Sequence, residues 1–344
     1  MSPADDHAAV VAAALGTVYG IRLAAVTRIR SGTATANFHV RDHLGEQWFA
    51  KVYRDGADLS QELAALELSR FARDGGLPVP AVRPTLSGDL IARHGRLALS
   101  LWQYVDGAET AEGGLHGRRW TTVGLALGHL HRRLARHPSA APAQHNGATV
   151  CDLTRARHRY EQLIAAYARA PHLGAFEQWA LEAARERQSL LPRVAALLEG
   201  LPALTLQIVH GDLAAPNLLL RQTQVAAFID FQPPVPRHLS WEIARIGCDP
   251  RTVVRGPDWL DGLVRLTAAY RQEHPTARAE DLIHTVTVGC AYTLASVYPL
   301  SEPVREPGAV DAALEAYGRA RHTAALTLLD RLTDAEEALH AGLR

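Results

Sequence analysis

The sequence contains a single lysine among its 344 residues, Lys51, and the other 35 of its 36 basic residues are arginines. Alanine, leucine, glycine and proline are abundant, which indicates a GC-rich gene in which arginine codons displace lysine codons. A lysine kept in this setting indicates a position that needs a compact ammonium rather than a planar guanidinium. The alternative is chance survival on a surface strand, and the residue alone does not decide between the two.

Cysteine is also scarce, with only Cys151, Cys248 and Cys290. Their odd number and wide spacing argue against a disulfide framework or a zinc site and fit a reducing compartment. The first twenty residues include Asp5 and Asp6 instead of a basic region followed by an apolar stretch, and no apolar run reaches the roughly 18 residues of a membrane span. We therefore expect a cytoplasmic protein without a membrane partner.

An excess of either charge is absent as well. The formal net charge is zero and the pI is about 7.3, so no nucleic-acid-binding or acidic-membrane surface is expected. Hydrophobic residues make up 47% and charged residues 21% of the chain, which is typical of a globular protein. The length exceeds what one hydrophobic core usually supports, so two lobes are expected.

The N-terminal part shows the alternation and the aromatic and β-branched residues of strands. We expect strands at 25–29, 35–42, 47–53, 89–93 and 97–103, and helices at 5–19 and 59–73. After Val105-Asp106-Gly107 the pattern becomes helical. We expect helices at 118–137, 152–169, 175–198, 256–273, 279–297 and 308–341, a loop at 139–148, and a short strand-and-loop segment at 206–231.

That strand-and-loop segment carries the most informative residues. His210-Gly211-Asp212 is followed by Asn217 and then, at the far end of an expected hairpin, by Asp230. Because a hairpin folds its two ends together, Asn217 and Asp230 are expected to lie side by side, with Asp212 on the preceding loop. A carboxylate and an amide oxygen suit Mg²⁺, which also takes water and phosphate oxygens. Asp212 is then left to orient or deprotonate a hydroxyl.

HGDLAAPN followed by IDF resembles the catalytic core of the aminoglycoside phosphotransferase and choline kinase superfamily, and the resemblance covers about residues 25–245. It implies an α+β, protein-kinase-like bilobal fold. The small lobe is an antiparallel sheet with one helix, and the large lobe is mainly helical. The expected boundaries are a nucleotide-binding lobe at 1–102, a hinge at 103–107 and a catalytic and acceptor-binding lobe at 108–344.

The resemblance implies a role for each of these residues. Asp212 positions the acceptor hydroxyl and accepts its proton. His210 either braces the loop, which we favour, or takes part in catalysis directly. Asn217 and Asp230 hold Mg²⁺ against the nucleotide phosphates.

Lys51 occupies the third-strand position at which kinase-type enzymes place a phosphate-binding lysine. Its carboxylate partner is expected on the 59–73 helix, where Glu62 and Glu67 are the candidates and Glu62 matches the E-x-x-x-L spacing of the family. The nucleotide loop has no G-x-G-x-x-G motif. Its expected phosphate contacts are made instead by Ser31, Gly32 and Thr33.

The segment SLWQYVDG is similar to the hinge of the family. Main-chain groups of Gln103 and Val105 are expected to pair with the edge of the base. Trp102 precedes them, and its large side chain can influence which base fits. We therefore expect either ATP or GTP as the phosphoryl donor.

The sequence departs from the family pattern after Asp230. The usual G-D-P-x-x-D-L-A stretch reads RHLSWEIA, in which Glu242 replaces the aspartate that ties the catalytic loop in place and His238 replaces an acidic residue. No long activation segment follows, which argues against a protein kinase. His129 and His131 are two residues apart, which points them to different helix faces and predicts structural roles.

The leading expectation is a Mg²⁺-dependent small-molecule O-phosphotransferase, in the first place one that inactivates an antibiotic. The weak acidic excess between 230 and 320 indicates an acceptor that is not strongly polycationic. The alternatives are a kinase for homoserine, choline or a sugar and, from another class, a nucleotide-binding pseudokinase. The sequence leaves monomer or homodimer open.

Overall fold

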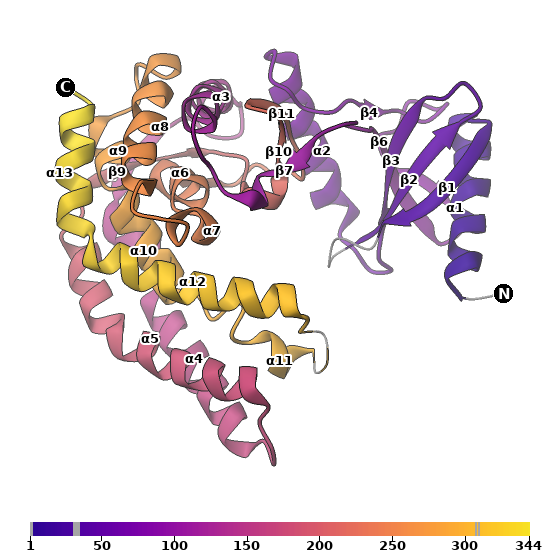
Figure 1. The fold of residues 1–344 in the computed structure, drawn as a ribbon. Helices are drawn as coiled ribbons and strands as arrows, with labels where there is room; N and C mark the ends of the chain where they lie inside the picture. The colour runs from indigo at the N-terminus through magenta and orange to yellow at the C-terminus, as the bar shows by residue number, and fades with distance from the viewer. Residues whose placement is uncertain (1–2, 30–34, 307, 309) are drawn as a thin grey trace. The chain divides into compact units, whose positions relative to one another are not determined.

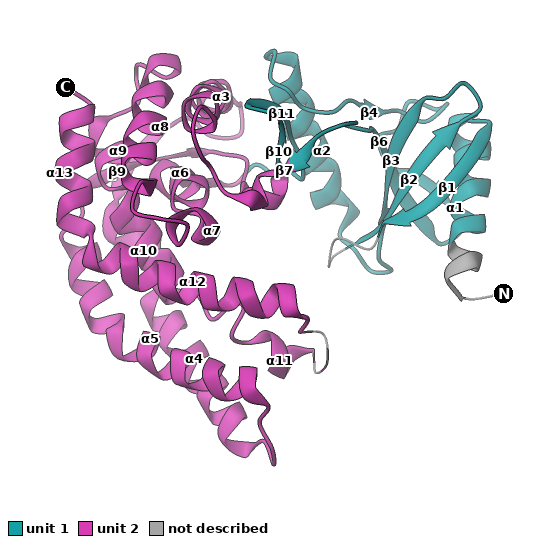
Figure 2. Cartoon of the chain, in the orientation of Figure 1, with its two compact units in different colours: residues 1–109, 218–234 teal, residues 110–217, 235–344 magenta. Residues whose placement is uncertain are grey.

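The computed structural model describes residues 3–29, 35–306, 308 and 310–344 (Figure 1). By its internal contacts the chain divides into two compact units, coloured separately in Figure 2. Unit 1 comprises residues 1–109 and 218–234, and unit 2 comprises residues 110–217 and 235–344. The segment 218–234 therefore belongs with the N-terminal unit, whereas the sequence analysis placed it in the C-terminal lobe.

Unit 1 combines an antiparallel sheet with two helices and a hairpin. Its helices are α1 (Pro3–Tyr19) and α2 (Leu59–Asp74), and its strands are β1 (Leu23–Ile29), β2 (Thr35–Asp42), β3 (Gln47–Tyr53), β4 (Val82–Arg83), β5 (Ala92–His94), β6 (Leu97–Gln103), β10 (Leu218–Arg221) and β11 (Gln224–Phe228). The sheet has the strand order β1-β2-β3-β6-β4, with β5 also paired to β6. Lys51 stands in the central strand β3, opposite Asn37 of β2 and Ser100 of β6.

The two faces of this sheet differ because side chains alternate along a strand. Ala50 and Val52 point to one face, where they are buried in a core that includes Val11 and Leu15 of α1. Lys51 lies between them in sequence and therefore points to the opposite face. The apolar packing of α1 thus fixes the face on which the lysine is presented.

The hairpin of β10 and β11 is tied to unit 1 by hydrogen bonds far apart in sequence. The Phe228 N–H donates to the carbonyl of Pro78 at 2.8 Å. Arg221 donates to the carbonyl of Asp106 at 2.5 Å. These contacts are the physical reason why the hairpin groups with the N-terminal sheet.

Unit 2 is mainly helical. Its helices are α3 (Arg119–Leu134), α4 (Leu153–Arg169), α5 (Ala175–Glu199), α6 (Leu239–Gly247), α7 (Pro250–Val253), α8 (Trp259–Glu273), α9 (Ala279–Ile283), α10 (Thr285–Ala295), α11 (Glu302–Arg305), α12 (Ala312–Asp330) and α13 (Leu332–Gly342), with 3₁₀ turns η1 (Ala111–Gly113), η2 (Gly147–Val150) and η3 (Ala215–Asn217). A small sheet has the order β12-β9-β8. Its strands are β8 (Ala143–Asn146), β9 (Ala203–Ile208) and β12 (Pro236–His238), and β7 (Glu109–Thr110) spans the boundary between the units. Among the described helices, none is both long and apolar enough to cross a membrane.

Two of the sequence expectations are corrected in unit 2. The expected loop at 139–148 contains β8, an exposed polar strand that forms because it pairs with β9. The expected helices at 279–297 and 308–341 are each interrupted, at His284 and at Arg331. The two parts of each helix have different main partners, although some are shared. Helix α9 packs on α13, α6 and β9, whereas α10 packs mainly on α5, α6 and α12; α12 packs mainly on α7 and α10, whereas α13 packs mainly on α8 and α9.

The close approach of α3 and α8 depends on small residues in α3. A Cβ at Gly124 would lie 2.3 Å from the carbonyl oxygen of Leu266, and a Cβ at Gly128 would lie 2.4 Å from that of Tyr270. Both distances are far below van der Waals contact. Any side chain at these positions must therefore push the helices apart.

We expect Gly124→Ala to lower the free energy of unfolding by about 1–3 kcal/mol, because the added methyl group overpacks the α3–α8 contact. Denaturant unfolding followed by circular dichroism measures the change. Gly256→Ala is the matched control, since a Cβ there meets nothing within 4 Å. Equal stability of the two variants would contradict the packing argument.

Candidate functional site

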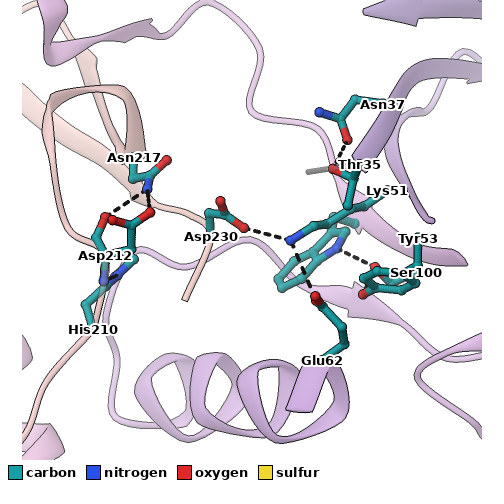
Figure 3. Close-up of polar contacts among 11 residues, drawn as sticks. Thr35, Asn37, Lys51, Tyr53, Glu62, Ser100, His210, Asp212, Asn217 and Asp230 are labelled. Carbon is teal, nitrogen blue, oxygen red and sulfur yellow. Dashed lines mark hydrogen bonds and ion pairs between the residues drawn. The ribbon is translucent and has the colours of Figure 1, made fainter. Parts of the chain in front are cut away.

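Lys51 is the centre of the polar cluster in unit 1. Its Nζ lies 2.7 Å from Oδ1 of Asp230 and 3.8 Å from Oε2 of Glu62 (Figure 3). The lysine side chain is only 19% exposed, so these contacts hold the ammonium in one place. Glu67, the other candidate partner, is exposed on α2. The geometry thus brings Glu62, rather than Glu67, to the lysine.

The residues around Lys51 share its face of the sheet because cross-strand partners and residues two apart point the same way. Tyr53 and Ser100 form a hydrogen bond of 2.9 Å between their hydroxyls (Figure 3). The indole N–H of Trp102 donates to the same serine at 3.0 Å. Trp102 is therefore held on the face that presents the lysine.

Asp230 follows the hairpin in an unusual backbone conformation. Its φ is +64°, in the left-handed region that non-glycine residues rarely adopt. Such a conformation costs free energy and is concentrated at functional sites. Here it accompanies the ion pair with Lys51, which takes up one of the two carboxylate oxygens.

In unit 2, the loop after β9 carries His210, Gly211 and Asp212. Gly211 has a φ of +90°, which a residue with a side chain would strain to adopt. The amide of Asn217 donates to the main-chain carbonyl of Asp212 at 2.8 Å and to its Oδ2 at 3.3 Å (Figure 3). Loop 210–217 is thereby closed on itself with the carboxylate of Asp212 held in place.

The Glu242 carboxylate anchors this loop to α6. It is completely buried and accepts hydrogen bonds of 2.8 Å from the main-chain N–H groups of His210 and Gly211. His131 of α3 lies 3.0 Å from it and also contacts the hydroxyl of Tyr270. These contacts show that Glu242 ties loop 210–217 to α6, and the structural role predicted for His131 is confirmed.

The environment of Glu242 favours its ionised form. Burial by itself raises the pKa of this carboxyl group, but the hydrogen bond and charge of His131, together with His210, outweigh it. The pKa of Glu242 therefore lies below its ordinary value. A charged carboxylate is the better acceptor for two main-chain N–H groups.

Arg245, which the sequence analysis did not identify, holds the other side of the loop. Its Nη2 is 2.5 Å from Oδ1 of Asp212, and its Nε donates to the carbonyl of Leu213 at 3.0 Å. Arg245 follows Glu242 by three residues, so one face of α6 presents both side chains to the loop. That i, i+3 spacing is the signal in the sequence that identifies it.

His210 is fully buried, and its Nδ1 accepts the N–H of Asp212 at 3.4 Å. This contact lies within the loop, which supports the bracing role that the sequence analysis favoured. The direct catalytic role of His210 stays an alternative prediction.

The predicted base-edge residues lie at the end of β6. The N–H of Gln103 is already donated to the carbonyl of Ala81 at 2.8 Å, and the N–H of Tyr104 to that of Gln47 at 3.2 Å. The N–H of Val105 makes no hydrogen bond to the described residues. Of these three N–H groups, only that of Val105 is thus available to donate a hydrogen bond to a base. Ser31, Gly32 and Thr33, predicted to contact phosphates, lie outside the described residues.

The two predicted metal ligands offer suitable atoms. Asn217 uses its amide nitrogen toward Asp212, and its Oδ1 makes no hydrogen bond to the described residues. Asp230 uses Oδ1 toward Lys51, and its Oδ2 makes none either. Hard oxygen donors of this kind fit Mg²⁺. Because Asn217 belongs to unit 2 and Asp230 to unit 1, their joint coordination stays a prediction.

We expect Glu242→Gln to lower the free energy of unfolding by about 1–3 kcal/mol at pH 7, because the amide can no longer accept from both loop N–H groups. The depressed pKa makes this contribution present above about pH 4.5, the ordinary carboxyl value, and lost as the pH falls through the folded-state value. Unfolding measured between pH 3 and 8 tests this.

The matched control is Glu273→Gln, which removes a half-exposed carboxylate paired with Arg132 on the same unit. Such surface pairs contribute only about 0–1 kcal/mol. A stability difference between wild type and Glu242→Gln that widened on acidification would contradict the role assigned to Glu242.

Comparison with known proteins gives concordant results. The model of the phosphotransferase enzyme family matches residues 25–281. The structure of spectinomycin phosphotransferase with ADP and spectinomycin is 15% identical and covers 96% of this chain and 98% of its own, with a TM-score of 0.68. Comparison with curated protein sequences gives no match.

Two further solved structures resemble the chain. The aminoglycoside phosphotransferase from Alicyclobacillus acidocaldarius is 18% identical over 94% of this chain and 95% of its own, with a TM-score of 0.57. A microcompartment-associated aminopropanol kinase is 18% identical over 97% and 98%, with a TM-score of 0.61. These likenesses confirm the α+β, protein-kinase-like fold class, and because the family model spans most of the sequence, the chain belongs to the phosphotransferase enzyme family.

Proposed function

We propose that the protein transfers the γ-phosphoryl group of ATP or GTP to a hydroxyl group of a small molecule. The observation that carries the proposal is the position of Lys51. The only lysine of the chain lies between Asp230 and Glu62, two carboxylates that are distant in sequence. A confined ammonium between carboxylates is the arrangement by which kinase-type enzymes bind nucleotide phosphates.

Unit 1 is proposed to bind the donor. Lys51 contacts the phosphates as a point charge, and Glu62 keeps it in place through the ion pair. The free N–H of Val105 donates to the base, and Trp102 lies beside the base on the same sheet face. The choice of donor stays open between ATP, whose base carries an amino group at this edge, and GTP, whose base carries a carbonyl group.

Asn217 and Asp230 are proposed to hold Mg²⁺, which neutralises negative charge on the phosphates when it is bound. Asn217 contributes Oδ1, whose orientation is fixed by the bonds from its amide nitrogen to Asp212. Asp230 contributes Oδ2. The phosphates of a bound nucleotide would compete with its Oδ1 for the ammonium of Lys51.

Asp212 is proposed to orient the acceptor hydroxyl and to receive its proton. Arg245 donates to Oδ1, and the amide of Asn217 donates to Oδ2 at 3.3 Å. A carboxylate fixed from both sides loses little conformational freedom when the hydroxyl binds, which favours a productive geometry. Glu242 and His210 contribute by keeping the loop backbone in position.

The acceptor is proposed to be a small molecule that is not strongly polycationic. Relatives of similar fold are named for spectinomycin, for aminoglycosides and for aminopropanol, which are two kinds of antibiotic and a small amino alcohol. An antibiotic-inactivating enzyme is the first candidate, and a kinase of a small metabolite is the second. A set of acceptors for the assay therefore includes both antibiotics and metabolites.

We expect Lys51→Arg to lower the affinity for Mg-ATP at least about tenfold despite its preserved charge, because a planar fork does not replace a point charge at the phosphates. Isothermal titration calorimetry measures the affinity. Arg93→Lys, the reverse exchange at an exposed position of β5, is the control and should bind as wild type does. Wild-type affinity in Lys51→Arg would contradict the role of the lysine.

We expect Asp212→Ala to reduce transfer by roughly 10²- to 10⁴-fold while Mg-ATP still binds with wild-type affinity, because the carboxylate acts on the acceptor. The assay is mass spectrometry of a panel of aminoglycosides, other antibiotics, homoserine, choline and sugars, incubated with Mg²⁺ and either ATP or GTP. Asp261→Ala, at an exposed position of α8, is the control. A product formed equally by Asp212→Ala would exclude the proposed chemistry. No product from any acceptor would favour a nucleotide-binding module.

A further inference from the structure

Unit 2 buries two arginines that form no ion pair with the described residues. Arg187 of α5 is completely buried, and Arg321 of α12 is 8% exposed. Within the described part of the chain, neither guanidinium forms an ion pair with a carboxylate. A buried charge without a counter-charge is strongly disfavoured. The pair therefore requires a physical explanation.

Each guanidinium also retains an unused donor. Nη2 of Arg187 and Nε of Arg321 are buried and make no hydrogen bond to any described residue. The remaining donors of Arg187 contact neutral acceptors, the carbonyl of Ser296 at 3.2 Å and Nδ1 of His322 at 3.3 Å. Arg321 donates to the hydroxyl of Tyr317 at 3.2 Å. Neutral acceptors of this kind do not compensate a positive charge.

Two carboxylates in this region, those of Glu186 and Asp249, are engaged elsewhere. Glu186 pairs with His322 on the side of the imidazole that faces away from Arg187, at 3.1 Å. Asp249 lies close enough to Arg321 for its pKa to be lowered by that charge, but it caps α7 and contacts Arg251. Burial nevertheless leaves the pKa of Asp249 above its ordinary value.

Tyrosines surround the two arginines and provide the other polar groups. Tyr160 neighbours Arg187 but donates its hydroxyl to the carbonyls of Leu294 and Ser296. The guanidinium of Arg321 lies 5.8 Å from the ring centre of Tyr292.

Tyr292 links this cluster to the loop that carries Asp212. Its hydroxyl accepts from Nη1 of Arg245 at 3.2 Å, and Nη2 of the same guanidinium holds Asp212. The ring of Tyr292 thus lies near two guanidinium groups, that of Arg245 at 6.0 Å and that of Arg321 at 5.8 Å from the ring centre. All of these residues belong to unit 2, so the arrangement is internal to one unit.

We propose that Arg187 and Arg321 bind an anionic group of the acceptor, a carboxylate or a sulfate or phosphate ester, while its hydroxyl meets Asp212. The inference rests on the proposed phosphotransferase function and specifies its substrate class. A planar guanidinium with free N–H groups is the usual partner of such oxyanions. The acceptor is accordingly an acidic hydroxyl compound, which contrasts with the polycationic aminoglycosides.

A purely structural role for the arginines makes a different prediction. In that case the side chains only bridge α5 and α12 to carbonyl and hydroxyl groups, and their loss lowers stability without changing any preference for charge. The experiment therefore measures selectivity and anion binding in addition to stability. Arg321→Gln is the main variant, because Arg321 is slightly exposed at the margin of the core, whereas Arg187 is completely buried. Arg187→Gln is the second variant.

Inorganic sulfate is the first probe. Thermal unfolding is measured with AMP-PNP and Mg²⁺ present at saturation, so that the nucleotide site is filled, in sodium sulfate and in sodium chloride of equal ionic strength. We expect sulfate to raise the unfolding midpoint of the wild type by about 2 °C or more, and Arg321→Gln to lose this shift. Arg319→Gln is the control, because Arg319 is exposed on the same helix and pairs with Glu315.

Matched acceptors are the second probe. Hydroxy acids are compared with their methyl esters and with the corresponding amines, and kcat/KM is measured from ADP release. We expect the acids to be preferred at least about tenfold, and Arg321→Gln to lose the preference. An equal sulfate shift in wild type and Arg321→Gln, or a preference for esters or amines, would overturn the proposal. Loss of turnover with every acceptor while the sulfate shift persists would refute the phosphotransferase function and leave the anion site standing.

Discussion

The buried carboxylate of Glu242 is the interaction on which the arrangement of unit 2 depends. Burying a charge without partners costs several kcal/mol, and here the two loop N–H groups and His131 offset that cost. Because these donors come from different elements, the carboxylate joins the loop after β9, helix α3 and helix α6 at one point. The position of Asp212 follows from this junction, since Arg245 lies one turn further along α6.

The chain uses its two kinds of cation for different tasks. Guanidinium groups occur where direction matters, as at Arg245, which binds a carboxylate, a carbonyl and a hydroxyl at once. The single ammonium of Lys51 occurs between two carboxylates, where a charge without fixed direction is sufficient. In a sequence otherwise restricted to arginine, this division is the reason that we propose for the retention of one lysine.

Much of the site could be predicted from local sequence. Lys51, Glu62 and Glu242 are identified by their spacing within expected elements, and the structure brings Glu62 to the lysine and Glu242 to the loop. Arg245 was missed because its partner Asp212 is 33 residues away, and the i, i+3 spacing to Glu242 is the one local signal that points to it. Strand β8 was missed because its residues are polar and exposed, and only pairing with β9 makes it a strand.

The sequence by itself determined the fold class, most of the elements and the candidates for the site residues, because alternation, helical spacing and short motifs are local properties of the chain. Only the tertiary structure decided that the hairpin at 218–234 groups with the N-terminal unit and that Arg187 and Arg321 are buried without an ion pair to any carboxylate of the described residues. Their surroundings come from helices more than a hundred residues apart. Burial and the lack of a counter-charge are properties of that packing, and no local pattern encodes them.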